Sequence, residues 1–158
     1  MADYIDFKEM LPLMIKTLET EGEITFTVTG NSMSPMLSGS VDTVTLVKPI
    51  FPLKKYDIPF YSRGDGKLIL HRIVAVHNDS YIIRGDNCSY TETDITKDNI
   101  IALVSSFTHK GKLHTVNEIG YRLYCALWCN AFSFLIRKRV FARIRRIPSK
   151  VKRLLSKK

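Results

Sequence analysis

The stretch ITFTVTGNSMSPML, residues 24–37, decides the fold of this chain. Its first six residues alternate apolar side chains with threonines, which is typical of a strand that buries one face. Gly30 and Asn31 then interrupt the alternation and Pro35 follows, a combination that indicates a tight loop. The sequence therefore predicts a strand that leads directly into a loop carrying Ser32.

Further short strands are expected on the C-terminal side of this loop, over residues 41–47, 58–62, 67–77, 81–84 and 100–107. Two turn signals separate them, RGDG at residues 63–66 and HNDS at residues 77–80. Residues 91–99 are polar and are predicted to form a loop. Many short strands with regular turns and few helices predict a compact, mainly β body.

The first 22 residues are expected to form a short amphipathic helix packed on that body. Apolar residues recur near helical spacing at Ile5, Leu11, Ile15 and Leu18. Acidic side chains interrupt any apolar run, so this segment is not expected to be a signal peptide. The predicted organisation is a helix over residues 1–22, a β domain over residues 23–116 and a helical tail over residues 117–158.

The tail carries the net charge of +9. Residues 137–158 contain eleven Lys or Arg and no acidic residue, so the rest of the chain is close to neutral. Residues 123–136 are uncharged but shorter than the roughly 20 residues of a membrane span. An apolar segment followed by a basic amphipathic one favours binding to an anionic membrane surface over binding to nucleic acid.

The three cysteines, Cys88, Cys125 and Cys129, are too few and too irregularly spaced for a disulfide framework. Cys125 and Cys129 are expected to be buried thiols rather than metal ligands. Cys88 is assigned a local packing role. This cysteine usage fits a reducing compartment.

Three short motifs contain the candidate catalytic residues. Ser32 lies in GNSMSP, His71 in LHRIV and Asp86 in RGDN, in this order along the chain. A hydroxyl, an imidazole and a carboxylate are the groups of a serine nucleophile, a general base and a residue that orients the base. Each motif alone is weak, because serine and aspartate are common in turns and a buried histidine can simply satisfy hydrogen bonds. Asp94 is a second candidate for the orienting carboxylate.

These motifs resemble those of the serine peptidases of the signal peptidase and LexA-like superfamily. Residues 30–35 resemble the nucleophile box, and residues 85–87 resemble the GDN box. Many members use a lysine base. Residues 70–74 resemble instead the histidine version found in archaeal and endoplasmic-reticulum signal peptidases. The resemblance covers about residues 24–104.

The resemblance implies a serine endopeptidase that forms an acyl-enzyme at Ser32, with His71 as general base and Asp86 orienting it. The backbone N–H of Ser32 would hold the oxyanion, with Gly30, Asn31 and Met33 as the oxyanion- and substrate-binding residues. Signal peptidases usually carry serine where this chain has Gly30. Met33 and Met36 are also expected to pack beneath the nucleophile loop. The substrate would be a leader or signal-like peptide, and no metal or organic cofactor is required.

Two alternatives remain open. A LexA-like self-cleaving regulator would need an N-terminal DNA-binding domain and a lysine base, whereas 23 residues precede the first strand and His71 stands at the base position. The second alternative is a non-catalytic, membrane-associated binding module on the same fold. With no N-terminal segment that would export it, the body is expected on the cytoplasmic side of a membrane. The sequence leaves the oligomeric state undetermined.

Overall fold

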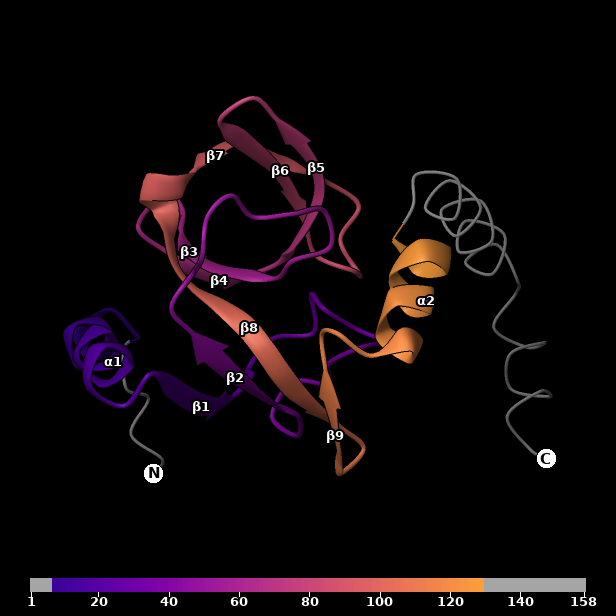
Figure 1. Ribbon diagram of the computed structural model, residues 1–158, viewed down its shortest axis with the longest axis horizontal. Coiled ribbons are helices and arrows are strands. Elements are labelled where there is room, and N and C mark those ends of the chain that lie inside the picture. Colours follow the sequence, from indigo (N-terminus) through magenta and orange to yellow (C-terminus); the bar gives the residue numbers. More distant parts are fainter. Residues whose placement is uncertain (1–6, 130–158) are drawn as a thin grey trace, which may run out of the picture.

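The computed structural model describes residues 7–129, which form two antiparallel sheets flanked by two α-helices (Figure 1). The first sheet has the strand order β1-β2-β8-β3-β4, and β9 also pairs with β8. Its strands are β1 (Glu23–Thr27), β2 (Thr43–Val47), β3 (Pro59–Ser62), β4 (Leu68–Leu70), β8 (Ile100–His109) and β9 (Lys112–Thr115). The second sheet has the order β5-β6-β7, with β5 (Arg72–His77), β6 (Ser80–Arg84) and β7 (Glu92–Thr96). The helices are α1 (Phe7–Thr20), the short 3₁₀ helix η1 (Lys97–Asn99) and α2 (Ile119–Trp128).

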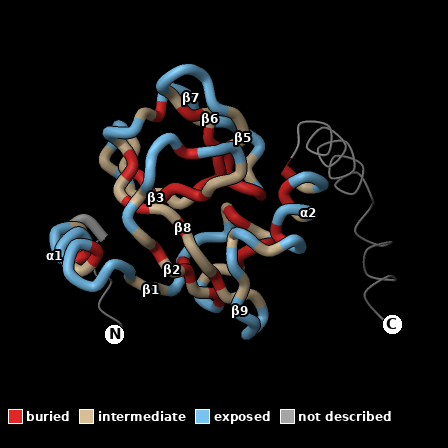
Figure 2. Tube along the Cα trace, in the orientation of Figure 1, coloured by how far each residue is buried: buried red, intermediate tan, exposed pale blue. Residues whose placement is uncertain are grey.

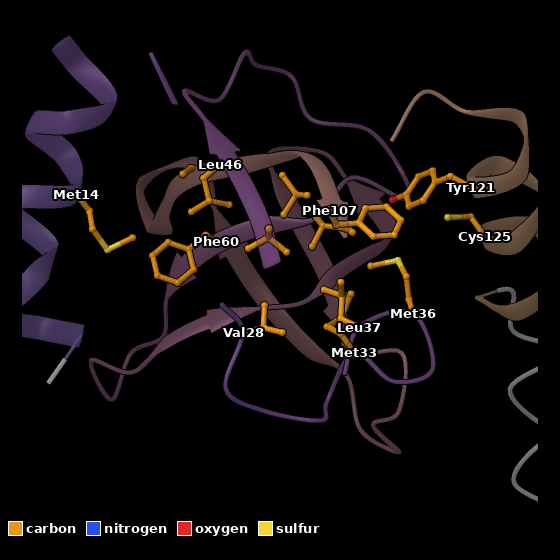
Figure 3. Packing of buried hydrophobic residues seen from close by; sticks show 14 of the residues in the cluster. Met14, Val28, Met33, Met36, Leu37, Leu46, Phe60, Phe107, Tyr121 and Cys125 are labelled. Atoms are coloured by element: carbon orange, nitrogen blue, oxygen red, sulfur yellow. The ribbon is translucent and has the colours of Figure 1, made fainter. Parts of the chain in front are cut away.

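Alternating apolar residues build the core of the first sheet. In β2, Val44 and Leu46 are fully buried, whereas the alternating residues Thr43 and Thr45 are not. Met14 of α1 covers one end of this core, and Tyr121 of α2 packs at the other (Figure 3). Figure 2 shows the buried positions concentrated along the strands and on the inner face of α2. The core therefore extends from one helix to the other across the sheet.

The predicted mainly β fold is confirmed, and so is an amphipathic helix near the N-terminus, at α1. Met14 and Leu18 are buried one turn apart on its inner face, whereas Ile15, which the sequence assigned to the packed face, is exposed. This is the burial pattern expected of a helix that packs one side against a core. The division into three segments remains a prediction.

The single strand predicted over residues 67–77 is wrong, because the chain changes sheets at His71. On one side of it β4 pairs with β3, with Leu70 opposite Phe60. On the other side β5 pairs with β6, with Arg72 opposite Arg84. A continuous apolar pattern does not reveal this break, because both strands bury part of their surface and only their partners differ. His71 therefore lies at the corner between the two sheets.

The predicted loop over residues 91–99 is also wrong, since it contains β7 and η1. β7 is the outer strand of the second sheet, and Ile95 is its buried residue. An outer strand can remain largely polar because one face and one edge meet solvent, which hides it from a search for apolar alternation. The hairpin strand β9 was not predicted either, and its residues are mostly exposed.

Part of the predicted tail lies outside the described residues. α2 occupies its first turns, whereas the apolar and basic segments from residue 130 onward are not described. Within residues 7–129, no helix has the length and apolar character needed to cross a membrane.

Candidate active site

The loop that carries Ser32 connects β1 to β2 and is closed by backbone hydrogen bonds. The N–H of Val28 donates to the Asp42 carbonyl at 3.1 Å, and the N–H of Ser40 donates to the Val28 carbonyl. Inside the loop, the N–H of Leu37 donates to the Met33 carbonyl at 3.0 Å. The Ser32 side chain is therefore held on a fixed loop at the end of β1.

Apolar residues anchor this loop from below. Met33, Met36 and Leu37 are all buried in the main core (Figure 3). The prediction that Met33 and Met36 pack beneath the nucleophile loop is confirmed. Burial of three apolar side chains within five residues fixes the loop to the sheet, so Ser32 does not depend on its own contacts for position.

The RGDN motif contacts the Ser32 loop directly. The N–H of Asn87 donates to the Ser32 carbonyl at 2.8 Å, and the Asn87 side-chain amide donates to the Asn31 carbonyl at 3.3 Å. Gly85 lies between the other two motifs. A Cβ atom on Gly85 would come within 2.7 Å of the Ser32 carbonyl oxygen and 2.8 Å of His71 Nε2. All three sequence motifs therefore meet at this point.

His71 is buried, with 3% of its surface exposed. Its Nδ1 lies 3.5 Å from Oε1 of Glu92, and its Nε2 lies 3.9 Å from the Cys88 sulfur. Burial lowers the pKa of His71 below its ordinary value, and the Glu92 carboxylate opposes that effect. A neutral imidazole at neutral pH is the form that can accept a proton from a hydroxyl.

The prediction that Asp86 orients His71 differs from the structure. The Asp86 carboxylate accepts two hydrogen bonds from Arg72, one from Nε at 2.8 Å and one from Nη2 at 2.7 Å, which together form a buried bidentate ion pair. A guanidinium fork matches a carboxylate in this way, and burying either charge alone would be costly. The carboxylate that faces the imidazole is that of Glu92, at the start of β7.

The Arg72–Asp86 pair also connects the site to α2. Nη1 of Arg72 donates to the Tyr121 hydroxyl and to the Cys125 sulfur, and the Tyr124 hydroxyl donates to Asp86 at 3.0 Å. Burial opposes the charge on Arg72, but Asp86 and the polar groups around it hold its pKa well above the ordinary value. Cys125 and Cys129 are buried free thiols, as the sequence predicts.

A pocket of about 580 Å³ contains Ser32 and His71 in its lining. Arg63, Lys67 and Tyr90 add polar groups to its wall. Apolar side chains from β1, β3, β4 and the Ser32 loop form much of the rest, namely Phe26, Val28, Met33, Leu37, Phe60, Leu68, Ile69 and Leu70. A pocket of this size, with both apolar and polar side chains in its wall, is suited to a peptide side chain or small ligand.

The predicted oxyanion- and substrate-binding residues fall in different places. Gly30 and Met33 both line the pocket. Asn31 is not part of the lining, and its side-chain oxygen accepts the N–H of Gly39 at 3.2 Å. In the described part of the chain, no group of three or more His, Cys, Asp or Glu side chains is arranged to hold a metal ion.

Sequence reasoning missed Glu92, because the polar segment around it looks like a loop. Its one signal is the alternation of threonine with acidic residues at positions 91–94, which is compatible with an outer strand. The second candidate, Asp94, is exposed, and its carboxylate accepts the hydroxyl of Thr93. Arg63 was read only as part of a turn.

Comparison of the chain with protein-family models and with curated proteins returned no match.

Replacing Asp86 should destabilise the fold. In Asp86→Ala the Arg72 guanidinium loses its partner inside the core, so we expect unfolding by urea to show a loss of about 3–5 kcal/mol. Asp79→Ala, at an exposed turn, is the matched control and should change stability by less than about 0.5 kcal/mol. Equal stability of the two variants would contradict a structural role for the ion pair.

Replacing Gly85 should disrupt the site. In Gly85→Ala the new methyl group would push apart the Ser32 loop and the His71 ring, both of which it would meet at less than 3.0 Å. We expect Ser32 to lose its reactivity toward a serine-directed fluorophosphonate probe. Gly64→Ala, where a Cβ meets nothing within 4 Å, should react as the unmodified protein does. A fully reactive Gly85→Ala protein would show that this close contact is not required.

Proposed function

We propose that this protein is a serine endopeptidase of signal-peptidase type, with Ser32 as nucleophile and His71 as general base. The observation that carries the proposal is that Ser32 and His71 line one pocket while a carboxylate faces Nδ1 of the buried imidazole. The likeness of the three motifs to the histidine-dependent signal peptidases supports the same reaction. Glu92 replaces Asp86 as the carboxylate that orients the base.

Each step follows from the chemistry of these groups. His71 Nε2 takes the hydroxyl proton of Ser32 as Oγ attacks the scissile carbonyl carbon, and the carbonyl oxygen becomes an oxyanion. Backbone N–H groups of the Ser32 loop would bind that oxyanion. The imidazolium then protonates the leaving amine, which leaves an acyl group on Ser32. Water, activated by His71, hydrolyses this ester and releases the second product.

The pocket also indicates how a substrate would bind. β1 and β4 are the two end strands in the order of the first sheet, and residues of both line the pocket. An extended peptide can add to such an edge through backbone hydrogen bonds, with alternate side chains entering a pocket. The apolar wall favours a small or apolar side chain next to the cleaved bond, as in a leader or signal-like peptide.

We also propose that this body works at a membrane surface. Ile119, Leu123 and Leu127 lie four residues apart along α2, and all three are exposed. A row of exposed apolar residues on one helix face is suited to the lipid interface. The basic residues of segment 137–158 follow in the sequence and would add attraction to anionic lipid. Salt-sensitive binding to vesicles of anionic phospholipid, and none to neutral vesicles, is the expected behaviour.

The decisive test compares the protein with its Ser32→Ala variant on an unbiased peptide library in the presence of lipid. We expect cleavage by the unmodified protein only, because the proposed mechanism forms the acyl intermediate on the Ser32 hydroxyl. Glu92→Gln should lower the rate by roughly 10²–10⁴-fold, whereas Asp86→Asn should act mainly through stability. Cleavage that persists undiminished in Ser32→Ala would contradict the proposal. Absence of both cleavage and fluorophosphonate labelling would favour a non-catalytic binding module.

Gly30→Ser should raise the reactivity of Ser32. A Cβ atom at Gly30 meets nothing within 4 Å, so the substitution should alter the free energy of unfolding by no more than about 0.5 kcal/mol. The added hydroxyl would stand at the pocket wall, where it could donate to the oxyanion. We expect faster probe labelling with unchanged stability, and Gly30→Ala serves as the control without a donor. Equal rates in these two variants would show that the hydroxyl does not reach the oxyanion.

A further inference from the structure

A second group of polar side chains lies around Nδ1 of His71. It contains Tyr61, Arg63 and Glu92, and it comes from both sheets. Five buried polar atoms meet there: Tyr61 Oη, Arg63 Nε, His71 Nδ1 and both Glu92 carboxylate oxygens. Within residues 7–129 none of the five completes a well-aligned hydrogen bond. Buried polar groups without such bonds are rare, and they are frequently found at functional sites.

Arg63 is the charged partner of Glu92 in this group. Its Nε lies 3.3 Å from Glu92 Oε2, while the other carboxylate oxygen, Oε1, lies 3.5 Å from His71 Nδ1. The carboxylate is therefore placed between a guanidinium and an imidazole, one on each oxygen. A carboxylate with a cationic or polar partner at each oxygen is restricted in its rotation.

The backbone of Arg63 is itself fixed. It begins the turn between β3 and β4, where its N–H donates to the Lys67 carbonyl at 2.8 Å. Its carbonyl accepts the N–H of Gly66 at 2.7 Å. Gly66 adopts a φ of 77°, a conformation that favours glycine in such a turn. The turn therefore presents the guanidinium from the first sheet to Glu92 on the second.

Tyr61 closes the other side of the group. It is fully buried on β3, and its hydroxyl lies beside the Glu92 carboxylate. Burial and the nearby carboxylate raise the pKa of Tyr61 well above its ordinary value, so the hydroxyl remains a donor at physiological pH. Its ring is tilted against the His71 ring, with centroids 6.5 Å apart.

We propose that Arg63 is a positioning residue, which holds the Glu92 carboxylate opposite His71 and thereby sets the orientation of the general base. The proposal rests on the function proposed above, since it assigns His71 the role of base. Arg63 also lines the substrate pocket. A peptide bound along β4 would shield the Arg63–Glu92 pair from water and strengthen it, because opposite charges attract more in a drier environment. Contacts at 3.3–3.5 Å are expected to tighten when substrate is present.

The test is a double-substitution cycle read on His71. The titratable and charged groups that act on its ring are Glu92, Arg63 and Asp86 through their charges, and Cys88 and Tyr61 as neighbours. Imidazole titration by NMR gives the pKa of His71 in the unmodified protein, in Glu92→Gln, in Arg63→Gln and in the double variant. Because Glu92 raises this pKa, Glu92→Gln should lower it. If Arg63 holds Glu92 in place, Glu92→Gln should lower the His71 pKa by much less, roughly half or under, when residue 63 is glutamine.

Two further variants separate positioning from charge. Arg63→Lys retains the charge without the planar fork, so we expect it to restore only part of the coupling between residue 92 and His71. Arg122→Gln removes an arginine from the exposed face of α2 and should leave both the coupling and the His71 pKa unchanged. An effect of Glu92→Gln that is the same size with arginine or glutamine at residue 63 would overturn the proposal. Circular dichroism of each variant would confirm that it is folded.

Probe labelling of Ser32 over a range of pH gives the second measurement. We expect Arg63→Gln to lower the labelling rate about 10-fold or more at the optimum pH, since a wrongly oriented base is less effective. Coupling seen by NMR without labelling of the unmodified protein would refute the proposed peptidase while retaining the role of Arg63. Labelling of the unmodified protein without coupling would refute the role of Arg63 alone.

Discussion

The buried ion pair between Arg72 and Asp86 is the contact on which the rest of the site depends. It joins β5 to the RGDN loop, and its guanidinium also contacts Met36 of the Ser32 loop and the inner face of α2. Two charges taken out of water are tolerated only where geometry and hydrogen bonding are nearly complete, as they are here. The pair therefore fixes four segments that are distant in sequence. His71 immediately precedes Arg72, so its position is fixed as well.

Two carboxylates with different surroundings divide the work in this site. Asp86 is held by a two-pronged guanidinium and a tyrosine hydroxyl, so its oxygens are committed to structure. Glu92 has looser ionic contacts of 3.3–3.5 Å with Arg63 and His71, and the Tyr61 hydroxyl lies beside it. A carboxylate that is not fully engaged can respond when the imidazole becomes charged, which is what orienting a general base requires. The motif that contains Asp86 thus supports the site, and β7 supplies the carboxylate that faces the His71 imidazole.

The two sheets contribute different parts. The first sheet and its loops provide the Ser32 loop, the pocket wall and Arg63, and the second provides Glu92. His71 stands at the corner where the chain passes from one to the other. Any shift between the sheets would change the positions of His71, Ser32 and Glu92 relative to one another. The close contact of Gly85 with Ser32 and His71 limits such a shift, because no space remains for a larger residue.

Local sequence determined the mainly β fold, the α1 helix, the loop that carries Ser32 and the burial of Met33 and Met36. These features depend on alternation, turn residues and apolar periodicity over a few neighbouring positions, which a single chain displays directly. The tertiary structure alone decided that residues 67–77 break at His71 and that Asp86 pairs with Arg72. It also decided that Glu92 and Arg63 meet behind the imidazole. Which carboxylate faces a histidine depends on the packing of two sheets against each other, and no local pattern encodes that distance.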